Sequence, residues 1–471
     1  MTRRVLLGFA AVIAVGACTD QQNSPTAPAE TPSVASAKQT PSYVISFSAG
    51  QAGDVPAAIA GAGGKVRFVS RRAGLATAES SDPGFAGKLK AARGIRVVAM
   101  DRVVQWVDPK ERVEQASIGT NEAFFAAQWA PRSISAEEAW DDRARGRGAR
   151  VAVLDGGLNA DHIDLDHSVD VARSRSFVDG FQFNQDAPCG AAACFSHATH
   201  VAGIIAAEDD RNGTIGVAPG ATIIGVKVLH GGSGSFGAII SAIVYAATPT
   251  NDREEPGAGA HIINMSLGAT FPSSEDTGVL ALKALMDEAT TYAHEQGALV
   301  IASTGNGDRQ GRGIDHDQGN WFTLPAQAEH VVGVSALGPV GFALGATNFD
   351  RLASYSNFGT SIVDLSGPGG DAVLPGNETC TVGPLRTACW VFDMVLSPGT
   401  LGSNTGYFFA AGTSMSAPAV AGVAALVIGT KGPMHADDLL DVLVETADDL
   451  GATGVDPAHG QGRVNAFKAV Q

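Results

Sequence analysis

The chain beyond about residue 150 alternates short, wholly apolar runs with longer apolar segments of helical spacing. Short continuous apolar runs are typical of strands that are buried on both faces of a parallel sheet. Their alternation with helices predicts an α/β fold in which helices cover both faces of the sheet. We expect its strands at 151–155, 222–229, 261–265, 298–303 and 331–335, within a unit that spans 128–471.

Residues 43–108 carry a different pattern and are expected to form a separate, smaller α+β unit. We predict its strands at 43–47, 65–70, 74–79 and 95–100 and its helices at 54–62 and 84–93, with a last strand at 103–107 that closes it. Residues 109–127 are interpreted as a linker to the large unit.

The N-terminus has the pattern of an export signal, with two arginines followed by a short apolar stretch. That stretch is too short to span a bilayer comfortably, so residues 1–17 are expected to be a signal peptide. Val-Gly-Ala-Cys (15–18) is similar to a bacterial lipoprotein cleavage site, and Cys18 is then the lipidated first residue. An ordinary signal peptide with an incidental cysteine is the alternative. Residues 18–42 are predicted to be a disordered tether, because they are rich in Pro, Ser, Thr, Ala and Gln.

Composition narrows the class of protein without identifying a substrate. The formal net charge of −16 argues against nucleic acid as a partner, because nucleic acid is also negative. No segment after the signal has the length of a membrane-spanning helix, and the apolar run at 419–428 suits a core helix. We expect an exported protein that stays at the bacterial envelope through a lipid or is secreted, and that is a monomer.

Cysteine usage agrees with export. Besides Cys18 the chain has Cys189, Cys194, Cys380 and Cys389, and four cysteines allow three pairings. We favour Cys189–Cys194 and Cys380–Cys389, because each pair closes a short loop. A metal site is the alternative, but the spacings do not suit zinc.

Ser414 is the residue with the strongest chemical signal. It lies in Gly-Thr-Ser-Met-Ser-Ala-Pro (412–418), ahead of a run of small apolar residues (419–427) that predicts a buried helix. A serine at a helix N-terminus meets free N–H groups and a positive dipole end, and both stabilise an oxyanion. The same residue type also caps helices, so this motif alone does not decide between a cap and a nucleophile.

Two upstream motifs favour the nucleophile. Val-Ala-Val-Leu-Asp-Gly-Gly (151–157) predicts a buried strand that ends at Asp155, where open α/β sheets place their ligands. Ser-His-Ala-Thr-His (196–200) opens an apolar helix at His197. A histidine can act as base and then as acid, and an aspartate can orient it.

The order Asp155, His197, Ser414 and five further motifs resemble the subtilisin-like serine proteases. The resemblance covers about residues 125–471. The further motifs are Gly-Val-Ala-Pro (216–219), Val-Lys-Val-Leu (226–229), Ile-Asn-Met-Ser-Leu-Gly (263–268), Thr-Gly-Asn (304–306) and Ser-Asn-Phe-Gly (356–359). It implies a serine endopeptidase that hydrolyses polypeptides through an acyl-enzyme and uses no catalytic cofactor.

Further roles follow from the same resemblance. Asn306 matches the side-chain donor of the oxyanion hole, and residues 43–108 match an inhibitory prodomain that is cut off between Pro109 and Gln128. A permanent docking domain is the alternative for that unit. Structural calcium is expected at Asp164 and Asp210, the latter in the loop Glu208–Gly216; two solvated acids are the alternative. Two segments are expected to pair with an extended substrate as added strands: Gly232, Ser233 and Gly234, and Ser266, Leu267 and Gly268.

Three departures from the family pattern put the rate in question. Gly156 stands where a Ser or Thr hydroxyl usually follows the catalytic acid, Ala198 replaces a glycine beside His197, and Ala419 replaces a histidine after Pro418. A peptide-binding module without activity and an esterase that uses the same triad are the competing functions. The four intact groups, the strand-like substrate segments and the prodomain favour the protease.

Overall fold

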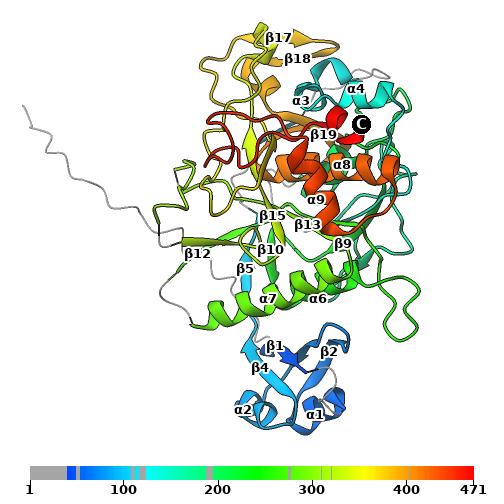
Figure 1. The fold of residues 1–471 in the computed structure, drawn as a ribbon, viewed down its shortest axis with the longest axis vertical. Helices are drawn as coiled ribbons and strands as arrows, with labels where there is room; N and C mark the ends of the chain where they lie inside the picture. The colour runs from blue at the N-terminus through cyan, green and yellow to red at the C-terminus, as the bar shows by residue number, and fades with distance from the viewer. Residues whose placement is uncertain are drawn as a thin grey trace, which may run out of the picture.

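A computed structural model describes residues 40–48, 54–107, 112–115, 124–186, 195–273, 277–308, 310–319, 321–401 and 404–471. Two sheets organise them (Figure 1). The predicted signal peptide with Cys18, most of the predicted tether, and Cys189 and Cys194 lie outside the described residues.

The large unit is built on a seven-stranded sheet whose neighbouring strands are all parallel. The five predicted strands are confirmed, and two short edge strands are added. The order across the sheet is β16 (Leu365–Pro368), β15 (Val331–Leu337), β13 (Leu299–Ser303), β11 (Ile262–Met265), β7 (Arg150–Asp155), β9 (Thr222–Lys227) and β8 (Arg175–Ser176).

Helices cover both faces of this sheet, as expected. Alternate residues of β7 enter opposite cores: Val151 and Val153 join one cluster, and Ala152 and Leu154 join the other. The first cluster contains α3 (Trp129–Ser133), α4 (Ala136–Asp141), α5 (His197–Ala206), α8 (Thr413–Lys431), α9 (Ala436–Glu445) and α10 (Ala466–Val470). The second contains α6 (Phe236–Ala247) and α7 (Thr277–Glu295).

Helix α8 is longer than the apolar run that predicted it. Among the described residues it alone has the length and hydropathy of a membrane-spanning helix, but 89% of its most apolar window is buried inside the protein. It therefore serves as the central core helix. Its length places Ser414 in the first turn, where backbone N–H groups have no partner within the helix.

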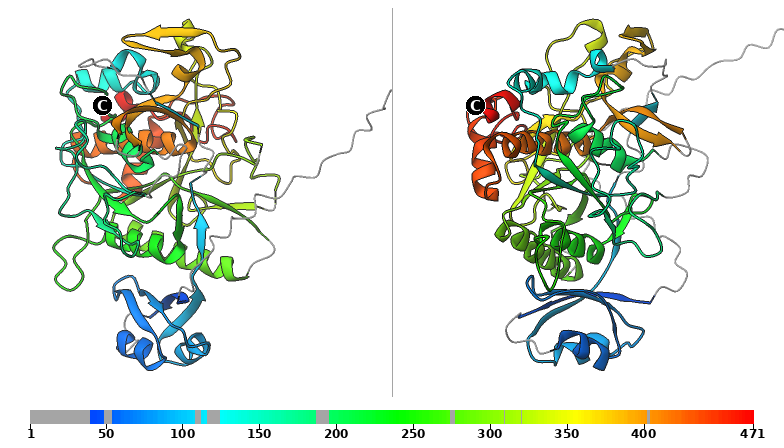
Figure 2. Two further views of the ribbon diagram at one scale, coloured as in Figure 1. Left: turned by 180° about the vertical axis from the view of Figure 1, so that it is seen from behind. Right: turned by 90° about the vertical axis from the view of Figure 1, so that its right-hand side faces the viewer.

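The small unit has its own sheet and core. The sheet order is β2 (Lys65–Ser70), β3 (Leu75–Glu79), β1 (Ser42–Phe47) and β4 (Ile95–Met100), and α1 (Val55–Gly61) and α2 (Phe85–Lys90) pack on it. Figure 2 shows the sheet facing the large unit and both helices facing away. Strands β1, β3 and β4 contact α6 and α7.

One predicted strand of this unit has a different partner. We expected 103–107 to close the small sheet, but β5 (Val103–Gln105) pairs antiparallel with β10 (Ser233–Ser235) of the large unit. An apolar run predicts that a strand forms but does not say which strand it will pair with. Here β5 pairs with a strand of the large unit. Helix α2 is also shorter than predicted.

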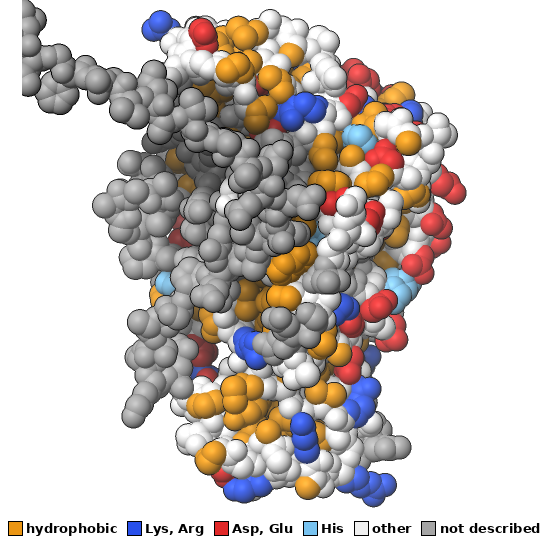
Figure 3. Space-filling view, turned by 90° about the vertical axis from the view of Figure 1, so that its left-hand side faces the viewer, with side chains coloured by type: hydrophobic (Ala, Val, Ile, Leu, Met, Phe, Trp, Pro, Cys, Tyr) orange, Lys and Arg blue, Asp and Glu red, His pale blue; other side chains and the backbone are white. Residues whose placement is uncertain are grey.

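Polar contacts hold the two units together. Asp101 accepts from the N–H of Gly237 (3.0 Å) and so caps α6. Glu288 of α7 accepts from Ser46 (2.8 Å) and pairs with Arg96 (2.7 Å). The small unit is basic, with nine Lys and Arg against four Asp and Glu in 42–107, whereas the whole chain carries −16. Lys and Arg side chains are accordingly frequent on the lower unit in Figure 3, and Asp and Glu on the edge of the upper one.

Smaller pairings complete the large unit. They are the antiparallel pair β12 (Ala269–Pro272) and β14 (Trp321–Leu324), the hairpin β17 (Thr379–Val382) with β18 (Leu385–Ala388), and a sheet of β19 (Val395–Leu401), β20 (Asn404–Ala411) and β6 (Arg112–Gln115). The predicted disulfide Cys380–Cys389 is present beside the β17–β18 hairpin.

Candidate active site

Asp155 and His197 lie together at the carboxyl end of the central strand. Asp155 ends β7 and is 1% exposed. His197 opens α5, whose N-cap is the side chain of Ser196. The Nδ1 atom of His197 lies 2.8 Å from Oδ2 of Asp155, which is hydrogen-bond distance. The pair predicted from two separate motifs is therefore formed.

Asp186 and Lys227 surround this pair, and sequence reasoning missed both. A methyl group at Gly156 would lie 3.2 Å from Oδ1 of Asp186, and that oxygen also accepts from the N–H of Gly157 (3.0 Å). Asp186 thus occupies the space that a Ser or Thr side chain would fill. Burial raises the pKa of Asp186 and lowers the pKa of Lys227, and each group offsets the effect on the other. The Val-Lys-Val-Leu motif was the available signal for Lys227.

Ser414 is tied to the segment that follows β11. Its Oγ donates a long hydrogen bond to the carbonyl oxygen of Ser266 (3.4 Å), and the Ser266 hydroxyl donates to the Ser414 carbonyl (2.8 Å). The side-chain amide of Asn264 donates to the Ser266 hydroxyl (3.0 Å). Ser414 lies at the start of α8 and His197 at the start of α5, and these two helices pack against each other.

Asn306 is oriented by the residue before Ser414. Both the N–H and the hydroxyl of Thr413 donate to its amide oxygen, each at 2.8 Å. That contact fixes which end of the amide is which and leaves the Nδ2 group as the end that can donate. Asn357 supports the loop, since its amide donates to the Thr304 carbonyl (2.8 Å) and accepts from the N–H of Gly307 (3.1 Å).

The two predicted substrate segments pair with the chain itself. Strand β5 lies along 233–235, and the N–H of Trp106 donates to the Gly232 carbonyl (2.9 Å). On the other side the N–H of Gly268 donates to the Trp106 carbonyl (2.8 Å). The Trp106 ring is 2% exposed, packs edge-on against Phe236, and donates to the Gly234 carbonyl (2.8 Å).

The second histidine of the motif, His200, is a packed residue. It is fully buried, and its Nε2 atom lies 2.9 Å from the Phe408 carbonyl. Burial lowers the pKa of His200 to about 3, so the ring is neutral at physiological pH.

Both residues predicted to hold calcium accept hydrogen bonds from other protein groups, and the prediction of a calcium site stays untested. Asp164 is completely buried; its Oδ1 accepts from the Tyr407 hydroxyl (2.6 Å), and its Oδ2 accepts from the N–H (2.9 Å) and hydroxyl (3.0 Å) of Thr214. These three donors occupy most of the acceptor positions of the Asp164 carboxylate, whereas calcium takes six to eight oxygen ligands. Asp210 is exposed and accepts from Asn212.

Comparison with known proteins agrees with this geometry. A model of the Subtilase family matches residues 146–462, more than half of the chain. The chain belongs to the subtilase family. Thermitase from Thermoactinomyces vulgaris is 31% identical over 354 residues, which cover 74% of this subtilase and 99% of that protein. Subtilisin DY from Bacillus licheniformis is also 31% identical, over 72% of this chain and 96% of that one.

Solved structures give the same family. A lanthipeptide protease is 27% identical with a TM-score of 0.57, covering 74% of this subtilase and 95% of that chain. An epidermin leader peptide processing serine protease from Staphylococcus aureus has a TM-score of 0.67 over 92% of this subtilase and 98% of that chain, and at 20% identity it shows the fold alone. This subtilase is therefore a subtilisin-like serine protease that acts on polypeptides, and the family needs no catalytic cofactor.

Asp164 makes stability depend on pH. Burial raises the pKa of Asp164 from 3.8 to about 6. A carboxyl with a higher pKa in the folded state stabilises the fold fully below the unfolded pKa, and this contribution is lost as the pH rises through the folded pKa. In a Ser414→Ala background, Asp164→Asn should therefore gain stability relative to the parent between pH 4 and pH 7, by up to about 3 kcal/mol. Urea unfolding at several pH values measures the difference.

Tyr407→Phe provides the second arm of that experiment. It removes a donor that favours the ionised form of Asp164, so the loss of stability with rising pH should be larger than in the parent. A stability difference between Asp164→Asn and the parent that stays flat from pH 4 to pH 7 would contradict the assignment.

Proposed function

We propose that this subtilase is a self-processing endopeptidase whose nucleophile is Ser414, whose base is His197 and whose orienting acid is Asp155. The observation that carries the proposal is the 2.8 Å contact between Nδ1 of His197 and Oδ2 of Asp155. His197 opens α5, which packs against α8, and the first turn of α8 contains Ser414. Asp155 holds the Nδ1–H of His197, which leaves Nε2 to take the proton of the serine hydroxyl.

The reaction then follows from the groups. The Ser414 hydroxyl leaves its 3.4 Å contact with Ser266, gives its proton to His197 and attacks the substrate carbonyl carbon. His197 returns that proton to the leaving amine, so the peptide C–N bond breaks and an acyl-enzyme remains. Water, deprotonated by His197, releases the acid product and restores the serine.

Asn306 is proposed to stabilise the oxyanion together with the backbone N–H of Ser414. Thr413 donates two hydrogen bonds to the amide oxygen of Asn306. The orientation of the amide nitrogen is therefore fixed before substrate binds. A preoriented donor stabilises the developing charge without reorganisation, which is why such donors contribute strongly to rate.

The small unit is proposed to be an inhibitory prodomain. Its last strand, β5, occupies the substrate edges on both sides of Trp106, as an extended peptide would. The chain is next paired at β6, against β20, which ends three residues before Ser414. These two anchors support a cut between Val107 and Arg112, an interval that overlaps the N-terminal end of the range expected from the sequence, Pro109 to Gln128. An uncut, permanently docked unit is the competing reading.

The exported form is proposed to carry a lipid on Cys18, with 18–42 as the tether that keeps a monomeric enzyme at the cell envelope. The motif Val-Gly-Ala-Cys (15–18) supports this part of the proposal.

Ser414→Ala should abolish hydrolysis of an unstructured protein, with a loss on the order of 10⁴-fold or more. The same variant of the full chain should stay uncut. The control is Ser416→Ala, because Ser416 is buried in the same helical turn and bonds only the Thr413 carbonyl (2.9 Å). Electrophoresis and peptide hydrolysis measure both effects, and a processed, active Ser414→Ala chain would rule out the proposed nucleophile.

Asn306→Ala should lower kcat by about 10²–10³ with little change in KM, the range found for removal of one oxyanion donor. Asn306→Asp separates donation from positioning, because aspartate can still accept from Thr413 but cannot donate. If Asn306→Asp keeps nearly full kcat, the residue acts only by holding Thr413.

Trp106→Ala should weaken inhibition of the processed enzyme by the separated fragment 40–107. A buried tryptophan in an interface contributes 2 kcal/mol or more, so the inhibition constant should rise by about 30-fold. Met100→Ala is the matched control, since Met100 is 60% exposed in the same unit. Equal inhibition constants for the Trp106 variant and the unchanged fragment would contradict the role of Trp106 as an anchor.

A further inference from the structure

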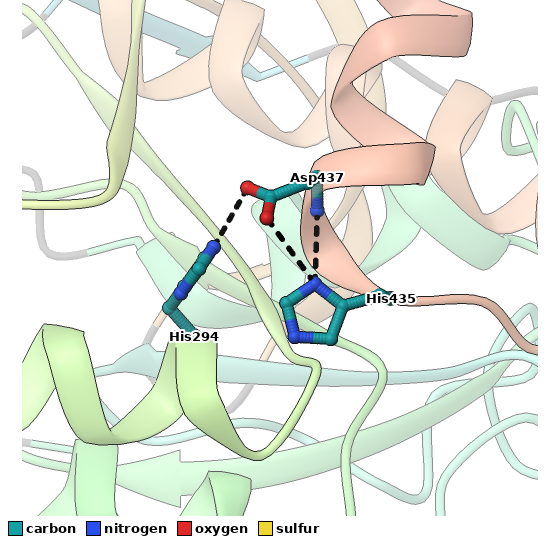
Figure 4. A group of neighbouring side chains, drawn as sticks. All are labelled: His294, His435 and Asp437. Atoms are coloured by element: carbon teal, nitrogen blue, oxygen red, sulfur yellow. Dashed lines mark hydrogen bonds and ion pairs between the residues drawn. The ribbon is translucent and has the colours of Figure 1, made fainter.

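Two histidines and an aspartate from distant parts of the chain converge at the surface (Figure 4). His294 lies in the last turn of α7, His435 is the N-cap of α9, and Asp437 is the second residue of α9. The Nε2 atom of His294 is 2.7 Å from Oδ1 of Asp437, and Nδ1 of His435 is 3.5 Å from Oδ2. One ligand atom of each residue lies within 4.8 Å of the other two.

The donor set is the kind that transition metals prefer. Zinc takes imidazole nitrogens and carboxylate oxygens at about 2.0–2.2 Å in tetrahedral geometry, which sets neighbouring ligand atoms about 3.4 Å apart. The distances of 2.7 and 3.5 Å bracket that value, so a small rotation of the side chains suffices. The His294 side chain is 19% exposed and Asp437 is 67% exposed, so an ion can enter from solvent and keep a water as its fourth ligand.

A third histidine orients the first. The ring of His330 stacks on that of His294, with centroids 4.0 Å apart and planes at 14°. His330 has a positive φ of 58°, a conformation that non-glycine residues rarely adopt. The stacked ring limits rotation of His294 and so presents its Nε2 atom to Asp437 and His435.

We propose that His294, His435 and Asp437 form a binding site for one divalent transition-metal ion of the zinc type. The site is separate from the catalytic groups. It lies where α7 turns through Gly297 into the start of β13, whereas Asn306 follows the other end of that strand. The ion would join α7, on one face of the sheet, to α9, on the other, and its role is to hold these layers together.

Another cluster provides a comparison within the same chain. Asp166, His167 and Glu208 also bring ligand atoms within 4.8 Å, but they contain one imidazole, and the His167 side chain is 83% exposed. Two imidazoles on separate elements favour the first cluster for a zinc-type ion.

The test uses the full chain with Ser414→Ala, stripped of metal and then titrated with ZnCl₂ by calorimetry. One equivalent should bind, and the Tm should rise with zinc, because an ion that binds only the folded state stabilises it. A constant excess of CaCl₂ should leave the zinc affinity unchanged, because calcium prefers oxygen ligands. Co²⁺ provides a second probe, since its visible absorption reports nitrogen and oxygen coordination.

The variants are chosen to keep the local fold. His435→Ser removes the ring but retains a hydroxyl that caps α9. Asp437→Asn keeps an acceptor for His294. Each should weaken zinc binding by more than about 10-fold and abolish the rise in Tm. His167→Gln is the control and should change neither.

Three outcomes would overturn the proposal. They are zinc binding with unchanged affinity in His435→Ser and Asp437→Asn, loss of binding in His167→Gln, and several weak equivalents without a rise in Tm. The Tm of each variant without metal, compared with the parent, separates loss of the site from loss of the fold.

Discussion

Close packing of helix α8 inside the large unit is the constraint on which the active site depends. The helix is built largely from small residues, so it approaches its neighbours closely: a methyl group at Gly422 would come within 2.6 Å of Val217. A helix packed this way on five strands of the large sheet, on β20 and on α5 cannot slide or rotate without clashes. Its first turn is therefore a fixed reference point, and the loops after β11 and β13 bond to it through Ser266 and Asn306.

The proposed catalytic groups gather where the carboxyl ends of the parallel strands meet. Asp155 ends β7, Ser266 follows β11, and Asn306 follows β13. Each of these strands is followed or ended by one polar residue. Hydrogen bonds from Ser266 and Asn306 to the start of α8 fix the positions of the loops. The proposed metal site uses the opposite edge, where the amino ends of the strands meet helix termini. The proposed catalytic site and the proposed metal site thus lie at opposite ends of the strands of the large sheet.

The small unit binds the large one through two general properties, its charge and the backbone of its last strand. Its basic surface meets an acidic partner, and its last strand supplies main-chain hydrogen bonds that any extended peptide could make. Trp106 adds a side-chain contact in the aromatic group of Phe236 and Phe271, and Ser46, Arg96 and Asp101 add polar ones. A strand that binds through its backbone imitates an extended substrate. In the proposed cycle the segments 232–235 and 266–268 therefore bind first the small unit and later the substrate.

The sequence by itself determined five of the seven strands of the large sheet, the four strands of the small sheet, the positions of Asp155, His197, Ser414 and Asn306 on their elements, and the Cys380–Cys389 pair. These features depend on residues that are close together in the chain, so hydrophobic periodicity and short motifs are sufficient to predict them. The tertiary structure decided what depends on partners far apart in the chain. It placed β5 on β10 instead of in the small sheet, put Asp186 in the space beside Gly156, and hydrogen-bonded Asp164 to Tyr407 and Thr214. It also brought His294 to Asp437, because helices on opposite faces of a sheet meet only after the sheet has formed.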